Sequence, residues 1–241
     1  MITLQRSRER KSQPCQDAAG ALSSPAPLSS VKRSSSQVDL AGRETPLQYI
    51  ASNVLAATVL TCATLEADLG TARRHIVWLA ELERLVTTSR AAIEQSLLDN
   101  LLRFGAPERE YDLAVALERA VRAAAQPARA RLDVELQVVP DSSRKLAETV
   151  MNAAAPLQDA ARTINDLRAI RSYTEETRAA AQCGERLYES AVAEEFGRVQ
   201  GHDHPVLDVV RRLALLRALR DAHQACVVAA AQCERFTLMS T

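Results

Sequence analysis

Two groups of side chains have the residue types that bind metals or act as nucleophiles. One is the run His-Asp-His at positions 202–204, and the other is His223, Cys226 and Cys233, which recur at steps of three and seven residues on one helical face. Imidazole, carboxylate and thiolate groups are common metal ligands. A Cys–His pair such as Cys226 with His223 also has the composition of a nucleophilic site.

Both groups also have a simpler explanation. The run 202–204 lies between Gly201 and Pro205, where Asp203 fits the N-cap of a helix. The second group fits a packed helical core, because a free cysteine behaves as a small hydrophobic residue. The sequence contains no P-loop, GxGxxG, GxSxG or HExxH motif. We therefore expect no enzyme, no metal site and no cofactor.

Arginines recur at helical spacing through the second half of the chain. The first set is Arg162, Arg168, Arg171, Arg178 and Arg186. A second set, at 211, 212, 217 and 220, lies nearer the C-terminus. Acidic residues alternate with both, so one interpretation is a solvated face with i,i+4 pairs such as Glu194–Arg198 and Asp208–Arg212. The other is that the first set binds an anionic membrane, each cation contributing ~1 kcal/mol.

The elements that position these residues are predicted to be helices alone. Apolar residues recur at steps of three and four, and only five glycines and six prolines occur between Pro46 and Phe236. The sequence predicts an all-α fold of long, kinked, antiparallel helices that form a bundle or coiled coil. We expect helices near 46–104, 107–137, 141–182 and 185–236. Thr45-Pro46 starts the first, Cys183-Gly184 forms a tight turn, and 201–205 is a kink.

The segment from Thr45 to Leu65 contains no charged residue and has the length of a transmembrane helix. Six of its residues are Gln, Ser, Asn or Thr side chains in addition to Thr45. We therefore expect a buried helix of the bundle at this position.

The last predicted helix is apolar on two stripes, which include Leu213, Leu215, Leu216 and Leu219. An apolar surface this wide requires partners on more than one side. We expect these leucines to form the interface of a homodimer, since an exposed apolar patch of that size is a liability in a monomer.

Composition limits the classes of partner. Lys+Arg and Asp+Glu both number 30, so the chain lacks the excess positive charge typical of proteins that bind nucleic acid. Aromatic residues make up only 3% of the sequence, which argues against a pocket for a small-molecule substrate. Five scattered cysteines without a CxxC motif favour a reducing compartment, so we expect a cytoplasmic protein.

Residues 1–45 have a composition typical of a disordered tail, and residues 46–238 form the predicted helical domain. Nine serines lie between Ser7 and Ser36. Ser35 and Ser36 follow Lys32-Arg33 and are candidate phosphorylation sites. The Arg- and Ser-rich start has two interpretations, a mitochondrial transit peptide or an ordinary basic tail.

Three stretches resemble a BAR domain. They lie between about residues 65 and 236: the leucine seam from 79–86 to Phe104-Gly105, the Ala155-Pro156-Leu157 segment, and a third stretch from 191–196 through a kink at Pro205 to 213–216 and 222–225. The resemblance implies a crescent-shaped dimer of three long kinked helices that binds curved, anionic membranes. It also implies a non-enzymatic scaffold at the periphery of a membrane, bound through the first arginine set.

Two features depart from the BAR pattern. Val139-Pro140 interrupts what should be a continuous second helix, and lysine occurs only at 11, 32 and 145. The alternative is a coiled-coil adaptor subunit of a cytoskeletal or tethering complex. Such an adaptor would bind a helical protein partner and no lipid.

Overall fold

The computed structural model describes residues 44–101, 108–200 and 206–239, and all regular structure in these ranges is α-helical. The helices are α1 (Pro46–Glu66), α2 (Leu69–Leu101), α3 (Glu108–Asp133), α4 (Asp141–Arg162), α5 (Leu167–Gln200) and α6 (Val206–Leu238). The prediction of an all-α helical bundle is confirmed.

Helix α1 begins where the sequence predicts. The Thr45 hydroxyl accepts a hydrogen bond from the Gln48 amide (3.2 Å), and the Gln48 side chain accepts one from the Thr45 amide (2.9 Å). This reciprocal pair is a capping box, and Pro46 occupies the first helical position.

The predicted helix over 46–104 is instead two helices that meet at Ala67-Asp68. Ala67 is extended (φ −72°, ψ 164°), and the Asp68 carboxylate accepts bonds from the Thr71 amide and hydroxyl at 3.0 and 2.8 Å. These bonds lower the pKa of Asp68. Asp68 therefore caps α2, and the apolar spacing continues across the turn, which is why periodicity alone missed it.

The second half of the chain is also divided differently from the prediction. The turn lies at 163–166, where the Asp166 carboxylate accepts bonds from the amides of Arg168 (3.0 Å) and Ala169 (3.1 Å). Cys183 and Gly184 lie inside α5, so the predicted tight turn there is wrong. The predicted break at Val139-Pro140 is confirmed, since α4 begins at Asp141. The predicted kink at 201–205 lies outside the described residues.

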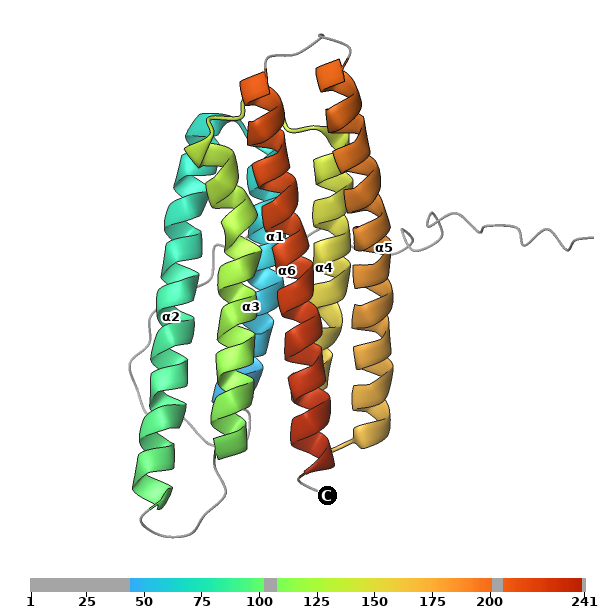
Figure 1. Cartoon of the computed structure of the whole chain (residues 1–241). Helices are drawn as coiled ribbons and strands as arrows, with labels where there is room; N and C mark the ends of the chain where they lie inside the picture. The colour runs from blue at the N-terminus through green and yellow to red at the C-terminus, as the bar shows by residue number, and fades with distance from the viewer. Residues whose placement is uncertain (1–43, 102–107, 201–205, 240–241) are drawn as a thin grey trace, which may run out of the picture. The chain divides into compact units, whose positions relative to one another are not determined.

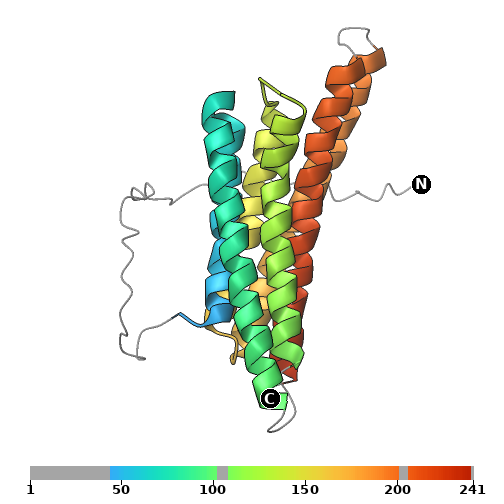
Figure 2. The same ribbon diagram turned by 90° about the vertical axis from the view of Figure 1, so that its left-hand side faces the viewer.

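The six helices form two groups of three (Figures 1 and 2). Helices α1, α2 and α3 pack on one another, and so do α4, α5 and α6. The groups meet where α1 lies against α4 and α3 against α6. Helices α2 and α5 thus occupy the two outer edges. Successive helices run in opposite directions, so α4 and α6 start at the end where α3 and α5 finish (Figure 1).

Small residues allow the central helices to approach closely. Buried alanines line α3, α4 and α6. Buried threonine hydroxyls donate across the gaps, from Thr61 to the Ala124 carbonyl (2.7 Å) and from Thr177 to the Ala153 carbonyl (3.2 Å). By length and composition α1 could cross a membrane, and half of its most apolar window is buried in the chain. That burial matches the predicted core helix, whose neighbours are α2, α3 and α4.

Candidate functional site

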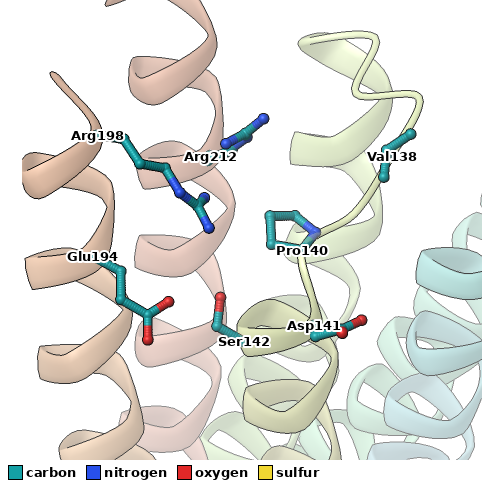
Figure 3. Close-up of a pocket in the computed structure, with 7 residues that line it drawn as sticks. All are labelled: Val138, Pro140, Asp141, Ser142, Glu194, Arg198 and Arg212. Carbon is teal, nitrogen blue, oxygen red and sulfur yellow. The ribbon is translucent and has the colours of Figure 1, made fainter. Parts of the chain in front are cut away.

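A polar cleft of about 350 Å³ opens at the end of the molecule where α4 and α6 begin and α5 finishes (Figure 3). The connection between α3 and α4, the first turn of α4, the last turns of α5 and the second turn of α6 form its walls. Its lining residues are Val138, Pro140, Asp141, Ser142, Glu194, Arg198 and Arg212.

Arg131 holds the α3–α4 connection in place. Its side chain is buried, with the residue only 2% exposed, and donates to carbonyl oxygens on two turns. The acceptors are Thr64 and Ala67 (2.7 Å) at the end of α1, and Leu136 (3.2 Å) and Gln137 (3.4 Å) in the connection. Burial lowers the pKa of Arg131. One guanidinium therefore satisfies carbonyls that the helix ends leave without partners.

Two arginines reach the cleft from different helices and share one buried carboxylate. Arg198 of α5 lies 2.5 Å from Glu195, and Arg212 of α6 lies 3.4 Å from the other oxygen of the same carboxylate. The Glu195 side chain is 2% exposed, whereas those of Arg198 and Arg212 are 37% and 19% exposed. One carboxylate thus contacts two guanidinium groups at this point.

Arg212 is incompletely hydrogen-bonded. The contact of 3.4 Å with Glu195 is long for a charge-assisted bond, which is ordinarily about 2.7–2.9 Å. Its Nε atom is buried and has no partner among the described residues. A buried N–H group without an acceptor costs free energy, so the hydrogen-bonding capacity of this guanidinium is incompletely satisfied.

The start of α4 adds hydrogen-bond donors to the cleft. Pro140 occupies the N-cap position and provides no side-chain cap. The first amides of a helix carry partial positive charge and favour an anion. The Ser142 hydroxyl also faces the opening (Figure 3). Asp141 points away from the arginines in this view, and its carboxylate lies 3.2 Å from Arg144.

The five arginines predicted to bind a membrane all lie on exposed parts of α4 and α5. Arg162 pairs with Asp159 (3.5 Å) at the end of α4. Arg171 and Arg178 are brought together by Glu234 of α6, at 3.6 and 3.5 Å. Arg168 and Arg186 are exposed on α5. None of these arginines lines the cleft.

The predicted i,i+4 pairs are replaced by others. Arg198 pairs with Glu195 instead of Glu194. Arg211 pairs with Asp208 (3.3 Å), and Arg212 reaches back to Glu195 on the neighbouring helix. Sequence spacing within one helix did not reveal this contact between helices.

The predicted dimer leucines occupy the interior of one chain. Leu215, Leu216 and Leu219 are at most 1% exposed and pack in a cluster with residues of α1, α3, α4 and α5. Leu213 is partly buried against the same cluster. Intramolecular packing therefore accounts for the apolar width of α6 without a second copy of the chain. The homodimer itself stays a prediction.

His223 fills a gap between helices rather than joining a metal site. Its Nε2 lies 2.9 Å from the Thr149 hydroxyl, and its Nδ1 lies 3.2 Å from the Leu219 carbonyl. Burial lowers the pKa of His223. Burial also raises the pKa of the Cys226 and Cys233 thiols to about 12, so neither is a thiolate at neutral pH.

Among the described residues no group of three His, Cys, Asp or Glu side chains is arranged to hold a metal. The candidate run 202–204 lies outside the described residues, as do the candidate phosphorylation sites Ser35 and Ser36. Sequence analysis named Arg198 only as a member of an ion pair, and Arg212 as a member of an ion pair and of the second arginine set. The break at Val139-Pro140 was the available signal, because it places a helix start beside the end of α5.

Comparison with known proteins identifies the fold and no close relative. No family model matches the sequence, and no curated protein matches it. A PhoU-like protein from Shewanella oneidensis MR-1 has a similar structure, with a TM-score of 0.69 and 13% identity over 81% of this chain and 99% of that one.

Two further solved structures agree. A PhoU-like phosphate regulatory protein from the same organism gives a TM-score of 0.63 at 11% identity, over 81% of this chain and 98% of that one. The phosphate transport system regulatory protein PhoU from Streptococcus pneumoniae gives 0.59 at 15% identity, over 81% and 95%. At these identities the likeness shows a shared fold.

The resemblance to BAR domains is wrong. The structural neighbours are PhoU-like proteins, and the turns at 67–68 and 163–166 divide the chain into helices of 21 to 34 residues that pack in two groups of three. The described helices do not form the three long kinked helices of a BAR domain. The membrane-scaffold function, which rested on that resemblance, is therefore also wrong. The coiled-coil adaptor fits no better, because the helices pack on one another within the chain.

Proposed function

We propose that this chain is a non-enzymatic, cytoplasmic regulator of phosphate transport. One observation carries the proposal: the described helices reproduce almost the whole length of solved PhoU-like proteins, up to 99% of the neighbour's chain. Two of those neighbours are described as phosphate regulators, and one as part of a phosphate transport system. The chain would act by binding proteins of such a system.

The chemistry of the described residues supports a regulator over an enzyme. The buried thiols are protonated, and His223 has its two ring nitrogens engaged by Thr149 and Leu219. The cleft offers the two guanidinium groups of Arg198 and Arg212 and the Ser142 hydroxyl as hydrogen-bond donors. Its composition suits binding rather than catalysis.

Exposed apolar side chains support contact with another protein. Phe196 near the end of α5 is 55% exposed, and Val206, Leu207 and Val210 at the start of α6 are 55–64% exposed. Apolar residues gathered in this way mark interaction sites. We assign contact with a phosphate transport protein to this end of α5 and α6.

Co-purification from the native cell tests the proposal. The tagged full-length chain should retain proteins of the phosphate transport system, identified by mass spectrometry. Leu207→Asp should abolish the retention while thermal unfolding stays unchanged, because the side chain is exposed. Val228→Asp, also exposed on α6 but farther along it, is the matched control. Retention of unrelated proteins only, or equal retention by the Leu207→Asp variant, would contradict the assignment.

A further inference from the structure

The cleft collects donors from three elements together with two carboxylates. Arg198 of α5, Arg212 of α6 and Ser142 in the first turn of α4 supply the donors. Glu194 is the carboxylate that faces them, whereas Asp141 points away and pairs with Arg144. In Figure 3 the side chains of Arg198, Glu194 and Ser142 point toward one another across the opening. The cleft therefore presents both hydrogen-bond donors and a hydrogen-bond acceptor to a ligand.

The donors are suited to an oxyanion. Guanidinium groups bind tetrahedral anions through several N–H bonds, and a helix N-terminus adds backbone amides. Arg212 makes only a long ion pair of 3.4 Å with Glu195 among the described residues, so its terminal N–H groups are weakly engaged and are open to a ligand in the cleft. Glu195 contacts both arginines, and Glu194 is the carboxylate that faces the opening.

Glu194 restricts which oxyanion fits. A carboxylate repels an anion that has only acceptor oxygens, because two acceptors facing each other share no proton. It accepts a hydrogen bond from an anion that still carries a proton. At neutral pH inorganic phosphate carries at least one proton, whereas sulfate carries none.

We propose that the cleft bounded by Arg198, Arg212, Ser142 and Glu194 is a binding site for inorganic phosphate in its hydrogen phosphate form. The arginines and the start of α4 bind its charged oxygens, and Glu194 accepts the proton of its hydroxyl. Because the cleft opens between α4 and the α5–α6 pair, phosphate bound there would contact α4, α5 and α6 together. The choice of phosphate rests on the proposed function. The site would allow a regulator of phosphate transport to sense phosphate directly.

Equilibrium dialysis of the full-length chain with radiolabelled phosphate at neutral pH tests the site. We expect saturable binding of phosphate. Sulfate should be a weaker competitor than unlabelled phosphate, and displacing the label should need about tenfold more of it, because one hydrogen bond to a charged group changes the affinity by at least that factor. Glycerol phosphate distinguishes phosphate monoesters from inorganic phosphate. Its second pKa is about 6, so at neutral pH it is mostly without the proton that Glu194 needs and should also compete poorly.

Matched variants locate the binding. Arg212→Gln should lower the affinity for phosphate about tenfold or more, because it removes a charged donor. Arg235→Gln, an exposed arginine at the far end of α6, should leave the affinity unchanged. Glu194→Gln should keep phosphate binding and allow sulfate to compete equally, since an amide donates to either anion. Circular dichroism melting checks that each variant folds, and Arg198→Gln replaces Arg212→Gln if the latter does not.

Several results would overturn the site. They are the absence of phosphate binding by the wild-type chain at millimolar phosphate, equal competition by sulfate, or full affinity in both folded arginine variants. The phosphate site and the proposed function are tested by different experiments. If the chain binds no phosphate but still retains phosphate transport proteins from the native cell, the phosphate site is refuted and the regulatory role stands.

Discussion

At the scale of single residues, the contact between Gly184 and His223 explains a glycine in the middle of α5. A Cβ placed on Gly184 would lie 2.5 Å from two atoms of the His223 ring. The ring in turn bridges α4 and α6 through Thr149 and Leu219. Glycine is required at this position by close packing, and the sequence alone suggested a turn.

Gly184→Ala should therefore destabilise the chain by about 1–3 kcal/mol, the cost of overpacking a core. Gly197→Ala is the matched control, because a Cβ there meets nothing within 4 Å and should stabilise α5 by about 0.5–1 kcal/mol. Urea unfolding followed by circular dichroism measures both. Equal effects of the two alanines would show that the ring does not fill this space.

His223 should make stability depend on pH. Its folded-state pKa is lowered from the ordinary 6.5 by burial, although Glu185 opposes the shift. The unfolded chain therefore binds the proton more readily, so the stabilising contribution is present above pH 6.5 and is lost as the pH falls below it. The slope is at most about 1.4 kcal/mol per pH unit for one proton. In urea unfolding between about pH 7.5 and 5.5, His223→Gln should lose less stability than the wild-type chain.

At the scale of elements, sequence periodicity predicted helices well and their boundaries poorly. Thr45-Pro46 and Pro140 mark boundaries through backbone chemistry, and both were found. The turns capped by Asp68 and Asp166 were missed, because the apolar spacing runs through them and neither contains proline. The cleft was missed for a different reason: it depends on which helix ends meet, and periodicity does not specify that.

Arg131 stabilises two connections, the turn between α1 and α2 and the segment between α3 and α4. Arg131→Met removes the donor to carbonyls of α1 and the α3–α4 connection, and should cost about 2 kcal/mol or more. Arg131→Lys should not rescue it, because one ammonium lacks the planar fork of donors. Arg119→Met, exposed on the same helix, should change the free energy of unfolding by less than about 0.5 kcal/mol. Chemical unfolding of the three variants makes the comparison, and a stable Arg131→Met chain would contradict it.

At the scale of the whole molecule, the leucines of α6 that were predicted to form a dimer interface pack inside one chain. Leu215→Glu places a carboxylate in a core position that is 0% exposed. It should abolish cooperative thermal unfolding instead of only separating a dimer, because an unpaired buried charge is strongly destabilising. Circular dichroism with light scattering distinguishes the outcomes. If the Leu215→Glu chain instead stays folded and has half the wild-type mass, the result would support the predicted dimer interface at these leucines.

The proposed function rests on two features of the described ranges, the cleft at Arg198 and Arg212 and the exposed apolar side chains at the end of α5 and the start of α6. The most direct measurement is the initial rate of phosphate uptake at one fixed phosphate concentration by native cells grown beforehand in low or in high phosphate, with and without this chain. Cells that contain the chain should take up phosphate more slowly after growth in high phosphate, whereas cells lacking it should show the same rate after both, and the wild-type chain should restore the difference. An equal difference in cells with and without the chain, with the wild-type chain expressed and folded, would contradict the proposed function.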